Sequence, residues 1–137
     1  MIALDTNILA RAIVTEVEAD EATLAQQQRA QSLLLSGQDL FIPVTVIEEL
    51  EWVLRGAYEL PRIEIADLLD DMLAVENMVV DRAAAVQQAV IWYRGGLDFS
   101  DALHLAQAGL CSGLATFDTR FAKVARRLGL QPPVTVP

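Results

Sequence analysis

Short apolar runs alternate along the chain with longer stretches in which apolar residues recur every three or four positions. The short runs predict buried β-strands, and the longer stretches predict amphipathic helices. The predicted strands are residues 2–4, 40–42, 78–80, 114–117 and 134–136. The predicted helices are residues 8–14, 16–36, 44–58, 61–74, 82–94, 100–110 and 119–128. Because helices separate successive strands, the order implies crossover connections and a mainly parallel sheet.

This pattern predicts an α/β fold of three layers, in which helices cover both faces of a central, mainly parallel sheet of four or five short strands. The chain has 137 residues, of which 53% are hydrophobic, so it is long and apolar enough to form a core. No internal repeat, low-complexity tract or linker interrupts it. We therefore expect a single domain that covers residues 1–137.

Charge and cysteine content narrow the classes of protein to consider. The 10 Lys and Arg against 19 Asp and Glu give a formal net charge of -9, which argues against binding nucleic acid through a large basic surface. A local basic strip, or a bound metal ion, remains compatible with this charge. The single cysteine, Cys111, cannot form an intrachain disulfide, and no signal peptide or membrane-spanning run is recognisable. We expect a soluble cytoplasmic protein without a membrane partner.

Several acidic residues stand where predicted strands end or helices begin. Asp5 follows the first strand, and Asp118 follows the fourth. Asp98 and Asp101, three residues apart, stand at the start of the helix between them. Ligands of open α/β sheets bind beyond the carboxyl ends of the strands, so these acids can meet there. Taken singly, each is more simply a helix cap, which is also the role we predict for Asp81 because no second acid accompanies it.

The helix predicted at residues 44–58 carries three glutamates on different faces. Glu48 and Glu51 lie with Arg55 opposite the apolar side, and we interpret both glutamates as solvated. Glu49 falls at the border of the apolar face, where its carboxylate can point into a cleft at the edge of the sheet. The wheel therefore favours Glu49 as the functional glutamate.

A shared site would have to hold four carboxylates, those of Asp5, Glu49, Asp101 and Asp118. At about 5 Å and an effective dielectric near 20, each pair would repel by roughly 3 kcal/mol, so a cation is needed to offset the charge. Oxygen ligands without a cysteine or histidine cluster suit Mg²⁺ or Mn²⁺, and we interpret the lone His104 as an ordinary helix residue. Such a centre suits phosphodiester hydrolysis.

Four segments of the chain, in their order and spacing, resemble the motifs of PIN-domain nucleases, and specifically look like those of the VapC toxins of bacterial toxin–antitoxin pairs. The segments read IALDTNIL, VTVIEELEWVL, DFSDALHLA and ATFDTRF. The resemblance covers nearly the whole chain. By position, Asp5, Glu49, Asp101 and Asp118 match the family's acidic cluster, Asp98 matches an accompanying acid, and Asn7 and Thr116 match polar residues that support the cluster.

The resemblance implies a Mg²⁺- or Mn²⁺-dependent endoribonuclease that cuts structured RNA, such as tRNA or ribosomal RNA, and arrests translation. Asp5 and Asp101 would hold the main metal ion, with Asp98 and Asp118 as further ligands. Glu49 and Asp118 would position or deprotonate the attacking water. The resemblance also implies a homodimer and a small, VapB-like antitoxin that places its C-terminal segment in the active-site groove.

Other interpretations remain open. A Mg²⁺-dependent phosphotransfer protein is disfavoured, since Asn7 stands where its second acid is usual. A housekeeping RNA-processing PIN nuclease and a catalytically silent interaction domain are further alternatives. The cations of the last predicted helix are candidates for phosphate contacts, although such a helix is more often a solubilising surface. They are Arg120, Lys123, Arg126 and Arg127.

Overall fold

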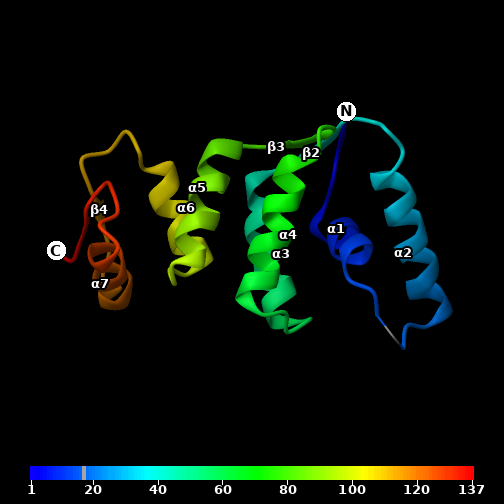
Figure 1. Cartoon of the computed structure of the whole chain (residues 1–137), viewed down its shortest axis with the longest axis horizontal. Helices are drawn as coiled ribbons and strands as arrows, with labels where there is room; N and C mark the ends of the chain where they lie inside the picture. Colours follow the sequence, from blue (N-terminus) through cyan, green and yellow to red (C-terminus); the bar gives the residue numbers. More distant parts are fainter. Residues whose placement is uncertain (17) are drawn as a thin grey trace. The chain divides into compact units, whose positions relative to one another are not determined.

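The computed structural model describes residues 1–16 and 18–137, in which seven helices and five short strands follow one another (Figure 1). The chain divides into two units, Met1–Asp81 and Arg82–Pro137. Every strand pair in the described residues is parallel. This arrangement of helices and short parallel strands confirms the predicted α/β class.

The first unit is organised around a three-stranded parallel sheet in the order β1-β2-β3. Its strands are β1 (Ile2–Ala3), β2 (Leu40–Ile42) and β3 (Met78–Val80). Two helices connect each strand to the next, which is the crossover that parallel pairing requires. These helices are α1 (Thr6–Ile13), α2 (Glu21–Leu34), α3 (Val44–Gly56) and α4 (Arg62–Ala74). Leu40 and Ile42 of the middle strand are fully buried, so β2 lies at the centre of this core.

Helix α2 begins later than predicted. The sequence pattern predicted a helix from residue 16, whereas α2 starts at Glu21 with Asp20 as its N-cap. Asp20 Oδ1 accepts a hydrogen bond from the backbone N–H of Thr23 at 2.7 Å, and this contact lowers the pKa of Asp20. Residue 17, within the predicted helix, lies outside the described residues. The carboxylate at the positive end of the helix dipole explains why the helix starts there.

Helix α3 contradicts the prediction that Glu51 is solvated. Glu51 is 2% exposed, and its Oε1 accepts a hydrogen bond from Arg55 Nε at 2.8 Å. The Arg55 side chain is about half exposed, at 48%. A helical wheel reports which residues share a face, but a carboxylate paired with a cation one turn away can be buried on a face that looks polar.

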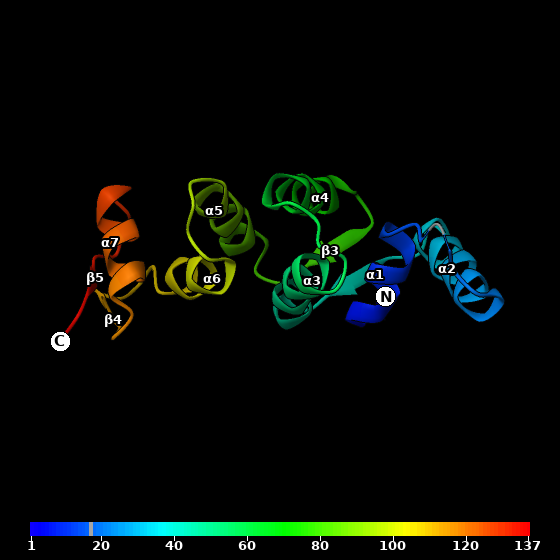
Figure 2. The same cartoon turned by 90° about the horizontal axis from the view of Figure 1, so that it is seen from below.

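The second unit combines a helix pair with a two-stranded parallel sheet. Its elements are α5 (Ala83–Arg94), α6 (Phe99–Gln107), β4 (Leu114–Ala115), α7 (Thr119–Arg127) and β5 (Val134–Thr135). Helices α5 and α6 lie side by side (Figure 2). The rings of Tyr93 and Phe99, both buried, pack edge to face across the turn between them, with centroids 5.3 Å apart. Gly96, with φ of +110°, makes this sharp turn possible.

The structure corrects three predictions near the start and the middle of the second unit. The predicted cap at Asp81 is wrong, because the N-cap of α5 is Arg82 in a left-handed conformation without a side-chain cap bond. Asp81 instead donates its backbone N–H to the carbonyl of Ile42, which extends the β2–β3 ladder. Strand β4 covers only two of its four predicted residues and is not buried, and Phe117 is 83% exposed. Helix α6 ends at Gln107, three residues before its predicted end.

In the part of the chain that the structure describes, no helix is both long enough and apolar enough to cross a membrane.

Candidate active site

Asp5 lies where β1 passes into α1. The backbone N–H of Leu4 donates to the carbonyl of Phe41, which continues the β1–β2 ladder up to Asp5. Asp5 is the N-cap of α1, and its Oδ1 accepts from the N–H of Thr6 at 2.8 Å. Its Oδ2 accepts from Asn7 Nδ2 at 3.4 Å. Both carboxylate oxygens are therefore oriented, while the side chain remains exposed at the carboxyl end of the strand.

Asp5 and Glu49 line one cleft of about 220 Å³. The two residues reach it from neighbouring segments, because β1 and β2 are paired in parallel and α1 and α3 leave the same edge of the sheet. Glu49 is exposed, and Val53, one turn later on α3, lines the same cleft. The volume lies below the roughly 300 Å³ at which small-molecule sites begin, so the cleft fits an ion or one phosphate group better than a whole nucleotide.

Arg11 and Tyr58 also line this acidic cleft, although the sequence pattern did not predict either residue there. Arg11 lies one turn after Asn7 on the same face of α1. A helical wheel of α1 therefore indicates that Arg11 is close to Asn7 and Asp5. Tyr58 follows α3, and its hydroxyl oxygen accepts from Arg11 Nη1 at 3.0 Å. This contact joins residues far apart in sequence, so periodicity could not predict it. A fixed cation therefore lies next to the two carboxylates.

Asp98 and Asp101 lie together at the start of α6. Asp98 is the N-cap, and its Oδ1 accepts from the backbone N–H of Asp101 at 3.3 Å. Asp101 is half-buried in the first turn, whereas Asp98 is exposed. The predicted capping role of Asp98 is present, and it uses the backbone of Asp101 rather than its carboxylate. The Asp101 side chain thus does not contribute to the cap.

Asp118 follows β4 and caps α7. Its Oδ1 accepts from the backbone N–H of Phe121 at 3.0 Å, and its own N–H donates to Thr116 Oγ1 at 3.0 Å. Thr116 and Asn7, the two residues proposed as supports, thus each contact an acid of the candidate set. A cap bond to one carboxylate oxygen leaves acceptor capacity on the other.

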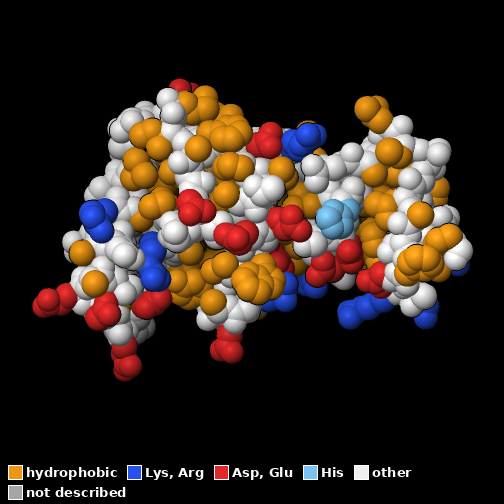
Figure 3. Space-filling model, turned by 180° about the vertical axis from the view of Figure 1, so that it is seen from behind, with side chains coloured by type: hydrophobic (Ala, Val, Ile, Leu, Met, Phe, Trp, Pro, Cys, Tyr) orange, Lys and Arg blue, Asp and Glu red, His pale blue; other side chains and the backbone are white. Residues whose placement is uncertain are grey.

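The carboxylates of the second unit act on one another. Burial raises the pKa of Asp101, and the negative charges of Asp98 and Asp118 raise it further. His104 opposes these effects, because its positive form would stabilise the ionised carboxylate. His104 is exposed, and acidic side chains lie beside it (Figure 3). A nearby cation would oppose these effects and favour the ionised form of Asp101.

Replacing Asp101 by asparagine is expected to stabilise the metal-free protein. Folding raises the pKa of this carboxyl above its unfolded value of about 3.9. The free energy of unfolding therefore falls as the pH rises from that value through the folded pKa. We expect Asp101→Asn to raise the free energy of unfolding by about 0.2–1 kcal/mol at pH 7, the range for partly solvated charge pairs. The variant should also lose less stability than the unsubstituted protein as the pH rises. Urea unfolding at pH 4 and pH 7 measures both effects. Asp71→Asn, which removes an exposed acid of α4, is the control; equal behaviour of the two variants would contradict the expectation.

The donors present fit a hard divalent cation. The candidate ligands are carboxylates, and Mg²⁺ and Mn²⁺ prefer such oxygen ligands. Burial and the charges of Asp98 and Asp118 raise the pKa of Asp101, and a bound cation would oppose both effects. Within either unit, and among its described residues, no three or more histidine, cysteine, aspartate and glutamate side chains form a metal-binding group. Asp5 and Glu49 belong to the first unit and Asp98, Asp101 and Asp118 to the second.

The cations of α7 all lie exposed on that helix; they are Arg120, Lys123, Arg126 and Arg127. Arg126 and Arg127 stand in the last turn, where positive charge is favourable to the helix dipole. This local role accounts for two of the four cations without an RNA contact.

The chain was compared with known protein families and with curated proteins. The family model of the PIN domain matches residues 2–127 and thus includes all the candidate acids. No curated protein matches the chain. PIN domains are generally nucleases, and PIN nucleases generally use divalent metal ions. Because the match extends over most of its length, the chain belongs to the PIN domain family.

Proposed function

We propose that the protein is a Mg²⁺-dependent endoribonuclease in which Asp5, Glu49, Asp101 and Asp118 are the catalytic acids. The observation that carries this proposal is the cleft that Asp5 and Glu49 line together, in a chain of the PIN family. The raised pKa of Asp101 supports it from the second unit, because acids with perturbed pKa values gather at functional sites. Mn²⁺ has the same ligand preferences and is the alternative cofactor.

Each acid has a proposed role. Asp5 and Asp101 hold the cation, and Asp98 and Asp118 are further ligands. Glu49 and Asp118 position the attacking water and accept its proton. When bound, the cation would supply Lewis acidity, which would lower the pKa of the water and offset charge on the phosphate. Asn7 and Thr116 orient Asp5 and Asp118 through the contacts described above.

We further propose that the enzyme is the toxin of a VapBC-type pair. The support is the resemblance of its four acidic segments to those of VapC toxins. On this proposal, the cytoplasmic enzyme cleaves structured RNA, such as tRNA or ribosomal RNA, and arrests translation. It forms a homodimer, and a small VapB-like antitoxin inhibits it.

Incubation of the purified full chain with total RNA, with and without Mg²⁺, tests the activity. We expect discrete new 5′ ends that require Mg²⁺ and disappear with EDTA. If RNA remains intact at every Mg²⁺ and Mn²⁺ concentration, the chain is better described as a silent interaction domain. Induction of the protein in cells tests the toxin role separately. RNA cleavage without growth arrest would favour an RNA-processing nuclease instead.

A further inference from the structure

A second and larger cleft lies between α1 and α2, with a volume of about 400 Å³. Its apolar lining consists of Ile8, Ala30 and Leu33. Asn7 and Arg11 line this cleft as well as the acidic one, so the two clefts meet at these side chains. Whatever occupies the α1–α2 cleft therefore lies next to the position of Asp5 and Glu49.

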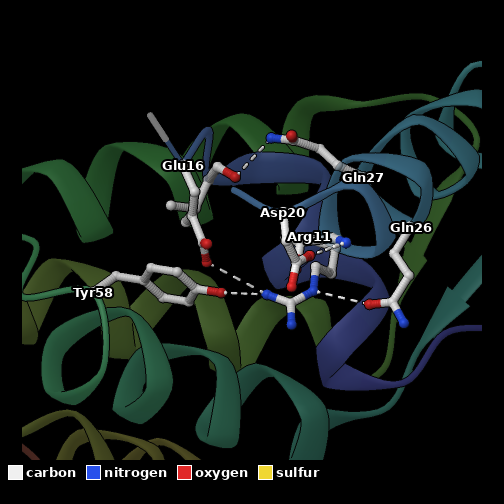
Figure 4. Close-up of polar contacts among 8 residues, drawn as sticks. Arg11, Glu16, Asp20, Gln26, Gln27 and Tyr58 are labelled. Carbon is white, nitrogen blue, oxygen red and sulfur yellow. Dashed lines mark hydrogen bonds and ion pairs between the residues drawn. The ribbon is translucent and has the colours of Figure 1, made fainter. Parts of the chain in front are cut away.

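Arg11 is fixed at this junction by contacts from three directions (Figure 4). Its Nε donates to Gln26 Oε1 of α2 at 3.2 Å, and its Nη1 donates to the hydroxyl of Tyr58 at 3.0 Å. Nη1 also lies 3.5 Å from Glu16 Oε1, which forms a partly exposed ion pair. These contacts involve Nε and Nη1, whereas a guanidinium carries two further N–H donors on Nη2. Arg11 is thus positioned to donate to a ligand without losing its supports.

Arg29 of α2 brings a second guanidinium to the same cleft. Its side chain is exposed, and no ion pair to it is seen among the described residues. The charged residues that line the cleft are Arg11 and Arg29, in a chain whose net charge is -9. The amide side chains of Asn7 and Gln26 complete the polar part of the lining. The cleft therefore combines two cationic side chains, an apolar floor and amide groups.

We propose that the α1–α2 cleft binds one nucleotide of the RNA substrate, adjacent to the phosphate that is cleaved. Arg11 and Arg29 hold its phosphate, since guanidinium groups bind phosphate oxygens through paired hydrogen bonds. The apolar floor contacts the base or ribose, and the amides of Asn7 and Gln26 can discriminate base edges. The volume falls within the roughly 300–1,000 Å³ of small-molecule sites. This inference rests on the proposed nuclease function and adds a subsite that selects the cleavage position.

The test compares Arg29→Gln with Arg62→Gln in the full chain. Both variants remove one exposed arginine of the first unit, but Arg62 belongs to α4 and lies outside both clefts. The cleavage position is first mapped in total RNA, and kinetics are then measured on an oligonucleotide that spans it. We expect Arg29→Gln to raise KM about tenfold with little change in kcat. The dependence of log KM on log salt should weaken by about 0.7, the value for one single-strand phosphate contact. Arg62→Gln should leave KM and its salt dependence unchanged. Arg29→Lys should raise KM less than Arg29→Gln does.

The outcomes separate this inference from the proposed function. If the unsubstituted protein cleaves RNA but Arg29→Gln and Arg62→Gln have the same KM and salt dependence, the subsite is wrong and the nuclease function stands. If Arg29→Gln leaves cleavage unchanged and weakens only the binding of an acidic peptide, the cleft is a protein-docking site and the inference is again wrong. Absence of RNA cleavage by the unsubstituted protein would overturn both proposals.

Discussion

Replacing Asp101 by asparagine is expected to reduce Mg²⁺-dependent RNA cleavage by on the order of 10²–10³-fold while the protein remains folded. A lost cation ligand removes several kcal/mol of transition-state stabilisation, and each 1.36 kcal/mol corresponds to a tenfold change in rate. The fold should persist because the cap of α6 uses the backbone N–H of Asp101, which asparagine retains. Cleavage rates at increasing Mg²⁺ concentrations, together with thermal melting, measure the two effects separately.

Asp5→Asn should show the same loss of activity. Asp5 is an N-cap, and asparagine is about as good an N-cap as aspartate, so this substitution keeps the local role and removes only the charge. Asp20→Asn is the control, because Asp20 also caps its helix through a carboxylate, which accepts from the backbone N–H of Thr23, and is not a candidate ligand. Full cleavage by both Asp5→Asn and Asp101→Asn would mean that neither carboxylate is a catalytic acid, and the nuclease site as proposed would be wrong.

The strands and helices followed from the sequence because their signals are local. Apolar runs such as residues 40–42 predicted strands, and the structure has a strand at each of the five predicted places. Helix starts were less predictable where acids are abundant. Residues 16, 18, 20 and 21 are all acidic, and only the contact of Asp20 with Thr23 distinguishes the true start.

The candidate site was predictable to the extent that topology determines it. Two parallel strands paired side by side carry their following segments to one edge, so Asp5 and Glu49 could be expected near each other. Tyr58 could not be expected there, since its contact with Arg11 joins residues 47 positions apart in sequence and depends on side-chain packing. The acids that begin helices also remained ambiguous in the sequence, because capping and metal binding select the same residue types.

The buried glutamate of α3 shows what periodicity alone cannot predict. Glu49 and Glu51 are two residues apart. The wheel placed Glu49 at the border of the apolar face, and in the structure Glu49 lines the acidic cleft together with Val53. It placed Glu51 in solvent, whereas the side chain is 3% exposed and paired with Arg55. Burial of a carboxylate costs free energy unless the charge is compensated, so the pair with Arg55 is the feature that permits it.

Removing the partner of the Glu51 carboxylate is therefore expected to lower the stability of the protein. We predict that Arg55→Ala lowers the free energy of unfolding by about 3 kcal/mol, because a buried charge is left without compensation. Urea unfolding at pH 7 measures this change. Arg29→Ala, which removes an exposed arginine of α2 that forms no ion pair among the described residues, should cost no more than about 0.5 kcal/mol.

The double variant Glu51→Leu/Arg55→Ala distinguishes lost compensation from lost packing. Replacing a buried ion pair by apolar residues is often neutral or stabilising, so the double variant should recover most of the stability that Arg55→Ala loses. The interaction between the two substitutions in a double-mutant cycle should then be of the order of 0.5–3 kcal/mol. If the double variant is as unstable as Arg55→Ala, the loss comes from the aliphatic part of Arg55 packing on α3. In that case Glu51 would tolerate burial without its ion pair, and the explanation given for its position on α3 would be wrong.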